Sequence, residues 1–331
     1  MASFPEKTFI IDKNNVKHEA SAPLIVSASR STDIPAFYGE WFSRRLDAGY
    51  VKWINPFNNA PFYVPFEKAR FFVFWSKNPR PFFPVLDRLA SEGIGFYVLY
   101  TVNNYDGLGF EPGVPPLSAR AETFAELSRR YGKERVVWRF DPLLLTDTLD
   151  MDGLFARIRE AGDAVARYTE KLVFSFCEIS KYPKVERNLR RERVGYIEFD
   201  RGMMLDAGAR LAELARGWGV IPASCAVETD LAEFGIVRNK CIDDELIARI
   251  SPGDRALMEF LGRDPLFPRT PPVKAPKDKG QRKYCGCVPS KDIGRYDTCP
   301  HYCVYCYANT SRRTAAENYR SADSNSESVT E

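Results

Sequence analysis

Three cysteines lie close together near the C-terminal end of this 331-residue chain, in the stretch DTCPHYCVYCYAN at 297–309. The spacing of Cys299, Cys303 and Cys306 allows one loop to bring three thiolates to a single metal centre, as loops that hold iron–sulfur clusters do. A structural zinc ion would need a fourth ligand and usually takes two separated cysteine pairs. The compact triplet therefore favours an iron–sulfur cluster, with zinc as the alternative.

Four other cysteines could form a second metal centre. Of the eight cysteines in the chain, three belong to the triplet, and Cys177 ends an apolar run and is expected to be a buried thiol. The remaining four are Cys225, Cys241, Cys285 and Cys287. Four thiolates would complete the ligand set of a closed [4Fe–4S] cluster or of a zinc site. Two alternatives stay open: these are unrelated free thiols, or one of Cys285, Cys287 and His301 completes a zinc site with the triplet.

Six short apolar runs, rich in β-branched and aromatic residues, are expected to be the strands that position these groups. They are LIVSAS (24–29), FFVFWS (71–76), FYVLYTV (96–102), VVWRFD (136–141), LVFSFC (172–177) and GVIPAS (219–224). Continuous apolar runs suit strands that are buried on both faces, and helical patterns such as 117–132 lie between them. Strands that alternate with helices predict an α/β fold with a parallel sheet, as a partial or complete TIM-like β/α barrel.

Polar side chains stand at the ends of four of these runs. They are Ser29, Arg30 and Asp33 after the first, Ser76, Lys77 and Asn78 after the second, Thr101 and Asn103 after the third, and Arg139 and Asp141 at the fourth. Because β/α barrels carry their chemistry at the carboxyl ends of the strands, these residues predict a polar pocket there. The alternative for each one is an ordinary polar loop start.

Composition divides the chain into five segments. We expect an N-terminal extension (1–22), a β/α barrel core (23–264), a Pro- and Lys-rich extended linker (265–284), a C-terminal cysteine segment that completes the barrel mouth (285–317) and a disordered Ser-, Asn- and Glu-rich tail (318–331). No apolar run reaches the roughly 18 to 20 residues that span a bilayer, and the start lacks the apolar core of a secretory signal. We therefore expect a cytoplasmic protein without membrane contact, in which cysteines serve as metal ligands or free thiols.

The motif C-x3-C-x2-C, with an aromatic residue before the last cysteine, resembles the signature of radical S-adenosylmethionine (radical SAM) enzymes. CPHYCVYCYA resembles in particular the spore photoproduct lyase, or DNA repair photolyase-like, branch. The resemblance implies that Cys299, Cys303 and Cys306 hold a [4Fe–4S] cluster whose open iron binds S-adenosylmethionine. An electron from a donor such as a flavodoxin or ferredoxin would then release a 5′-deoxyadenosyl radical that abstracts hydrogen from an unidentified substrate. Tyr305 and Tyr307 would flank the adenine or shield the cluster.

The resemblance extends to FFVFWSKNP, to the stretch that begins YTVNNYDGLGFEP, and to VVWRFDPLL, which are similar to strands of the same family. It implies a cofactor site in which Lys77 pairs with the cofactor carboxylate and Glu111 binds its amine or ribose. The other cofactor-binding candidates are Ser29, Thr101, Asn103, Arg139 and Asp141. In that family the cysteines precede these strands, whereas here they follow them, so we expect a circularly permuted barrel whose cysteine loop is C-terminal.

The whole chain also resembles an uncharacterised bacterial family of the DUF1848 type, in SASRSTDIPAFY, NPF and DIGRYDTCPHYCVYCYAN. The resemblance to the lyase branch suggests a nucleic acid or nucleotide substrate. The net charge of +3, from 47 basic and 44 acidic residues, gives that suggestion no support. The alternative function is a non-catalytic zinc- or Fe–S-binding module that recognises nucleic acid or protein through the basic linker KAPKDKGQRK (274–283).

Overall fold

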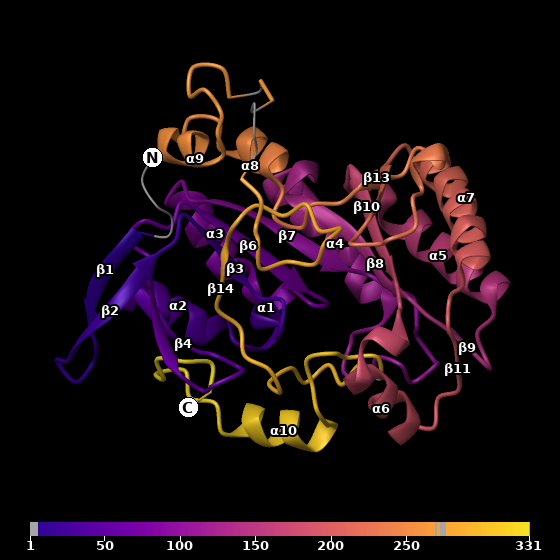
Figure 1. Ribbon diagram of the computed structural model, residues 1–331, viewed down its shortest axis with the longest axis horizontal. Coiled ribbons are helices and arrows are strands. Elements are labelled where there is room, and N and C mark those ends of the chain that lie inside the picture. Colours follow the sequence, from indigo (N-terminus) through magenta and orange to yellow (C-terminus); the bar gives the residue numbers. More distant parts are fainter. Residues whose placement is uncertain (1–5, 269, 272–275, 331) are drawn as a thin grey trace.

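An eight-stranded parallel sheet forms the centre of the computed structural model, which describes residues 6–268, 270–271 and 276–330 (Figure 1). In spatial order the strands are β13 (Val237–Arg238), β12 (Ile221–Ser224), β10 (Lys171–Phe176), β8 (Val136–Leu143), β7 (Gly95–Thr101), β6 (Phe71–Ser76), β3 (Ile25–Ala28) and β14 (Lys291–Asp292). Every neighbouring pair in this sheet is parallel. The prediction of an α/β fold built on a parallel sheet is therefore confirmed.

The predicted partial or complete TIM-like barrel is not shown, because no sheet among the described residues is closed. The edge strands β13 and β14 each contribute two residues and pair with one neighbour only, β12 and β3 respectively. Closure of a barrel would require these two edges to hydrogen-bond to each other. Such short strands offer few backbone groups for that pairing.

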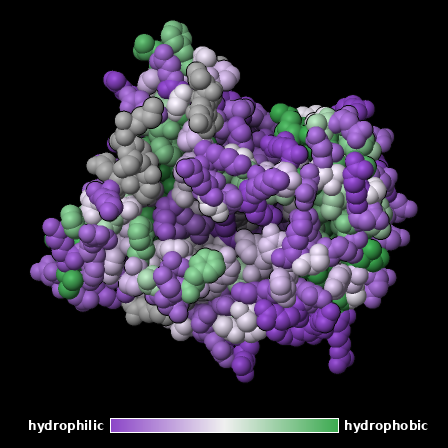
Figure 2. Space-filling model, in the orientation of Figure 1, coloured by the Kyte–Doolittle hydropathy of each residue, from purple (hydrophilic) through white to green (hydrophobic). Residues whose placement is uncertain are grey.

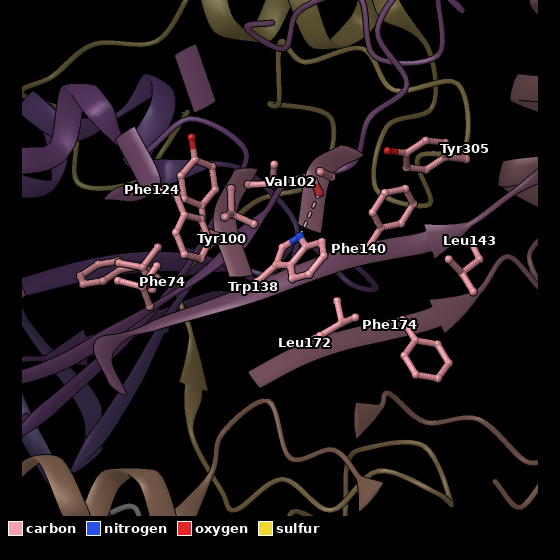
Figure 3. Packing of buried hydrophobic residues seen from close by; sticks show 14 of the residues in the cluster. Phe74, Tyr100, Val102, Phe124, Trp138, Phe140, Leu143, Leu172, Phe174 and Tyr305 are labelled. Atoms are coloured by element: carbon pink, nitrogen blue, oxygen red, sulfur yellow. Dashed lines mark hydrogen bonds between the residues drawn. The ribbon is translucent and has the colours of Figure 1, made fainter. Parts of the chain in front are cut away.

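One face of the sheet packs against five helices. These are α2 (Gly39–Ala48), α3 (Phe83–Ser91), α4 (Leu117–Tyr131), α5 (Met151–Val165) and α7 (Arg201–Trp218). Side chains alternate between the faces of a strand, so Phe72 and Phe74 of β6 join this core. Figure 3 shows the aromatic centre of the core, where the Trp138 indole donates a hydrogen bond of 3.0 Å to the Val102 carbonyl. Tyr305, from the cysteine loop, belongs to the same cluster.

The opposite face of the sheet has its own apolar core. Phe71 and Val73 of β6 point into it, and α8 (Asp244–Ile250) and α9 (Arg255–Phe260) cover it together with the segment 285–288. Because both faces are covered, the central strands are apolar throughout, which is the pattern that their sequences display.

A second, smaller sheet includes residues predicted to be an extension. Its order is β1 (Glu6–Ile11), β2 (Lys17–Ala22), β5 (Pro61–Pro65) and β4 (Tyr50–Ile54). The β1–β2 and β5–β4 pairs are antiparallel, and β2 pairs with β5 in parallel. The described part of the segment 1–22 is therefore a hairpin that extends the protein sideways (Figure 1).

The remaining elements are short. They are α1 (Ile34–Phe37), α6 (Pro183–Arg191), α10 (Arg312–Arg320), the strand pair β9 (Leu145–Thr146) and β11 (Tyr196–Ile197), and 3-10 helices at Arg80–Phe82, Lys133–Arg135, Ala166–Tyr168, Ile179–Lys181 and Ala232–Phe234. The predicted linker 265–284 has no helix or strand in its described residues, and 269 and 272–275 lie outside the described part.

The tail that we predicted to be disordered instead packs against the fold, as far as residue 330. The indole of Trp41 donates a hydrogen bond of 2.9 Å to the Ser326 carbonyl, and the Lys52 amide donates one of 2.8 Å to the Glu327 carbonyl. The Tyr50 hydroxyl donates to the Glu327 carboxylate. Composition misled the prediction because hydrogen bonds to α2 and β4 hold these polar residues in place, and Val329 is buried in the main apolar core.

Hydrophilic side chains cover most of the face of the molecule shown in Figure 2, and hydrophobic residues appear there as separate patches. Among the described residues, no helix combines the length and the apolar composition needed to cross a membrane.

Candidate functional site

The last strand of the sequence lies beside the strand that begins the α/β core. Lys291 and Asp292 of β14 pair in parallel with β3. The Ser27 and Ser29 hydroxyls donate hydrogen bonds to the Asp292 carboxylate at 3.0 and 3.1 Å, and the Arg30 amide donates to it at 3.0 Å. The chain leaves β14 at the carboxyl ends of the strands and runs directly into the cysteine loop (Figure 1). The loop therefore begins where the polar strand ends lie.

Asp33 joins the cysteine loop to two strand ends. Its Oδ2 atom lies 2.7 Å from His301 Nε2 and accepts a hydrogen bond of 2.7 Å from the Lys77 amide. Its Oδ1 atom caps α1 by accepting from the Ala36 amide at 2.9 Å. One buried carboxylate thus fixes the positions of β3, β6 and the loop between the first two cysteines.

The segment after β7 runs against the cysteine loop at close range. Two contacts join Gly113 and His301. The Gly113 amide donates to the His301 carbonyl at 3.0 Å, and Nδ1 of the His301 side chain lies 3.0 Å from the Gly113 carbonyl oxygen. A Cβ atom on Gly113 would lie 2.3 Å from the Pro300 carbonyl oxygen, so a glycine is needed there. The Val304 amide donates to the Phe110 carbonyl at 3.0 Å.

The Tyr305 hydroxyl contacts three polar side chains under the loop. Its hydroxyl lies 3.1 Å from Lys77 Nζ and 3.0 Å from Asn103 Nδ2, and it donates to the Glu111 carboxylate. Lys77 and Asn103 also donate directly to Glu111 Oε1, at 2.7 and 3.0 Å. The structure therefore gathers four of the predicted cofactor-binding residues into one network: Lys77 directly after β6, Asn103 and Glu111 after β7, and Tyr305 in the cysteine loop.

Arg120 of α4 is a second cation beside Glu111 that we did not predict. Its side chain is 1% exposed, lies 3.9 Å from Glu111 Oε2 and pairs with Asp106 at 2.6 Å. It also donates to the Asn103 carbonyl. Arg120 stands four residues before Phe124 on the apolar stripe of α4, and a charged residue in that register is the signal that would have revealed it.

The charges of this network keep Glu111 ionised. Burial alone would raise the pKa of its carboxyl group, but Lys77 and Arg120 lower that pKa to about 2. Burial likewise opposes the charge of Lys77, while Glu111 and Cys303 raise the pKa of the ammonium group above its ordinary value. The site thus holds a stable ion pair with little water around it.

The three cysteines of the loop are free and half-buried. Asn309 holds the loop closed: its side chain donates to the Cys299 carbonyl at 2.8 Å, and its amide donates to Cys306 Sγ at 3.3 Å. Asn188 of α6 donates to the Cys306 carbonyl at 3.0 Å. Burial raises the pKa of all three thiols.

The loop fits a thiolate-ligated cluster in its donor chemistry. Three sulfur ligands come from one loop, a backbone amide donates to one of them, and the Lys77 ammonium group lies close enough to Cys303 to offset thiolate charge. In the part of the chain that the structure describes, no three His, Cys, Asp or Glu side chains surround a single-ion position. This holds for the described residues of both cysteine sets, the triplet and Cys225, Cys241, Cys285 and Cys287.

The other predicted cofactor-binding residues lie around this network. Thr101 is buried at the end of β7, and Tyr307 is partly exposed with its hydroxyl donating to the Arg30 carbonyl. The Asp141 backbone bonds to the Asn103 side chain, while its carboxylate accepts from Arg139 and Ser175. The structure places the Arg139 side chain with the second cysteine set, away from Tyr305.

The second cysteine set also comes together. Cys225 Sγ and Cys241 Sγ lie 3.4 Å apart, and Cys287 Sγ accepts from the Cys241 amide at 3.2 Å. The Cys285 and Cys287 thiols interact with each other. All four are buried on the sheet face opposite the large helices.

The fold and the site define a class of protein: an open parallel α/β sheet that carries a three-cysteine loop on the carboxyl ends of its strands. Residues 25–308 match the family model described as "Domain of unknown function (DUF1848)", so the chain belongs to that family. The DUF1848 resemblance noted in the sequence is thereby confirmed.

The other comparisons add little. No curated protein matches the chain. Among solved structures, the crystal structure of a "putative alpha-L-fucosidase" from Bacteroides thetaiotaomicron VPI-5482 is similar at 11% identity over 76% of this chain and 83% of that chain. Its TM-score of 0.24 is too low to support an argument about fold or function.

Proposed function

We propose that the protein is a circularly permuted radical S-adenosylmethionine enzyme whose cluster is held by Cys299, Cys303 and Cys306. The observation that carries the proposal is the docking of the cysteine loop on the ends of β3, β6 and β7, through Asp33, Lys77 and Asn103. A loop that served only as a local metal clip would not need these contacts with three strand ends.

The strand order supports the permutation. From β3 to β13, neighbours in the sheet follow the order of the strands in the chain, and β14 alone is out of sequence. If residues 276–330 were moved in front of residue 6, β14 would become the first strand of a singly wound parallel sheet. The cysteine loop would then follow that first strand, as it does in the family that the motif resembles.

Two charged side chains suit the amino acid end of the cofactor. Lys77 and Glu111 carry the charges that complement the carboxylate and the ammonium group of S-adenosylmethionine. Their side chains are 15% and 4% exposed, so water screens them little. Asn103 and Tyr305 hold the Glu111 carboxylate in position, and the adjacent Tyr307 offers an aromatic ring for the adenine. Held by these residues and given one electron by an external donor, the cluster and S-adenosylmethionine would supply the radical chemistry that removes a hydrogen atom from the substrate.

The test is anaerobic reconstitution of the full-length protein with iron and sulfide, followed by dithionite and S-adenosylmethionine. We expect iron to bind and 5′-deoxyadenosine to form. The Cys299→Ala, Cys303→Ala, Cys306→Ala protein should form none, whereas the control Cys177→Ala should behave like the native protein. Native protein with a full cluster that cleaves no S-adenosylmethionine would refute the proposal. Protein purified without oxygen that holds zinc and no iron would instead favour a non-catalytic binding module.

A further inference from the structure

Four thiols from three separate segments converge on the second face of the sheet. Cys225 directly follows β12, Cys241 follows β13, and the segment that leads into β14 provides Cys285 and Cys287. Two central strands, β10 and β8, hold the segments in place: the Cys225 amide donates to the Phe174 carbonyl at 2.7 Å, and Arg139 of β8 reaches Cys241.

Two of the four sulfur atoms each accept two hydrogen bonds from N–H donors. Cys287 Sγ accepts from the Cys241 and Ile242 amides at 3.2 and 3.3 Å. Cys241 Sγ accepts from Asn239 Nδ2 and Arg139 Nη1, both at 3.3 Å. Neutral thiols are weak acceptors, whereas thiolates and metal-bound sulfurs attract several donors at once. This surrounding therefore suits sulfur that carries negative charge.

The buried Arg139 and the half-buried Arg30 add positive charge to the same place. Arg139 is 5% exposed and touches Cys241 directly, although Asp141 offsets part of its charge. The Arg30 guanidinium interacts electrostatically with the Asp292 carboxylate first and with Cys287 and Cys241 next, and its Nη2 atom is buried without a hydrogen-bond partner among the described residues. A buried cationic nitrogen without a partner is costly unless a negative group lies near it.

From these contacts we infer that Cys225, Cys241, Cys285 and Cys287 form a tetrathiolate metal centre, distinct from the triplet. It takes a thiophilic metal, either a zinc ion or an iron–sulfur cluster, and binding releases the thiol protons. A site with four thiolates and one zinc ion, or four thiolates and an oxidised [4Fe–4S] core, carries two negative charges, which Arg30 and Arg139 face. Among the described residues the four sulfurs do not surround a single-ion position, so metal binding would require their side chains to rotate.

The centre would fix the C-terminal segment to the rest of the protein. The Val288 amide donates to the Ile242 carbonyl at 3.1 Å, only a few residues before β14 and the triplet loop. Metal bound across Cys241 and Cys287 would anchor the entry to β14, and thereby the position of the first cysteine set.

The experiment uses the full-length Cys299→Ala, Cys303→Ala, Cys306→Ala protein, so that failure of the proposed catalytic function cannot influence it. Purified without oxygen, this protein should retain about four irons or one zinc per chain by stoichiometry. Visible absorption and iron analysis identify the cluster, and zinc analysis identifies the ion. Adding Cys241→Ala should remove that metal, whereas adding Cys177→Ala should not.

A second measurement guards against misfolding of the variants. The apo form of the triple-alanine protein, with native-like circular dichroism, is titrated with Cd²⁺, which gives a thiolate charge-transfer absorption. We expect saturation at one Cd²⁺ per chain, with at least tenfold weaker binding after Arg139→Gln. Absence of both retained metal and a Cd²⁺–thiolate signal would overturn the inference, as would a Cys225–Cys241 disulfide in protein that was kept without oxygen.

Discussion

The hydroxyl group of Tyr305 lies 3.1 Å from the Nζ atom of Lys77, although 228 positions separate the two residues in the chain. The same hydroxyl touches Asn103 and Glu111, which extends the link to β7 and the segment after it. One phenol thus ties the cysteine loop to the strand ends that form the proposed cofactor site.

Tyr305→Phe should destabilise the protein by about 1 to 3 kcal/mol, because the change leaves buried polar groups without a shared partner. The free energy of unfolding in denaturant measures the effect. Tyr307→Phe is the matched control, since Tyr307 is 44% exposed and water can replace its single hydrogen bond. If the two variants were equally stable, Tyr305 would not be the link described here.

Glu111→Gln should destabilise the protein by about 3 to 5 kcal/mol near neutral pH, because it leaves Lys77 and Arg120 buried with a neutral partner. The pKa of Glu111 is about 2 in the fold, below its ordinary value of 4.5. Its contribution is therefore fully present above pH 4.5 and is lost as the pH falls toward 2. Stability of the native protein should decline in that window more steeply than stability of the variant. Glu122→Gln, on an exposed pair with Arg80, should retain the native pH profile.

Gly113→Ala should displace the cysteine loop, because the new methyl group would lie 2.3 Å from the Pro300 carbonyl oxygen. Overpacking of this kind costs about 1 to 3 kcal/mol. We also expect less iron per chain after reconstitution. Gly217→Ala in α7 is the control, since nothing lies within 4 Å of its added methyl group. Equal iron loading in both variants would argue against the close approach.

The sequence predicted the centre of the sheet well. All six predicted runs overlap a strand of the large sheet, and the polar residues at their ends include Lys77 and Asn103 of the site. These strands were visible because burial on both faces makes them apolar throughout. The two-residue strands β13 and β14 were not predicted. A strand that short has no sequence periodicity of its own and forms only where a neighbouring strand provides hydrogen-bond partners.

Contacts between distant segments were harder to foresee. The Asp33–His301 contact joins residues 268 positions apart, and neither residue carries a local signal for the other. Asp33 is instead recognisable only as the N-cap of α1. We predicted a disordered tail from its composition. Composition alone does not show the hydrogen bonds that Trp41 and Lys52 donate to the tail.

A permuted chain that begins at residue 276 and joins the natural termini through a flexible linker should fold into the same structure. The C-terminal tail contacts the turn between β1 and β2, where the Lys13 amide donates to the Glu327 carboxylate at 3.3 Å, so the linker has to span at least the length of β1. Near-UV circular dichroism should match that of the native protein, and unfolding should stay cooperative. A permuted chain with native secondary structure but no cooperative transition would contradict the idea that β14 can serve as the first strand.

The most direct test of the central claim is electron paramagnetic resonance of the reduced, reconstituted protein with and without isotopically labelled S-adenosylmethionine. We predict that the cofactor alters the cluster signal and that nitrogen and oxygen labels in its amino and carboxylate groups produce hyperfine couplings. The triple-alanine protein should show neither effect, even if the second centre contains iron. A fully loaded native protein whose cluster signal is identical with and without the labelled cofactor would contradict the account.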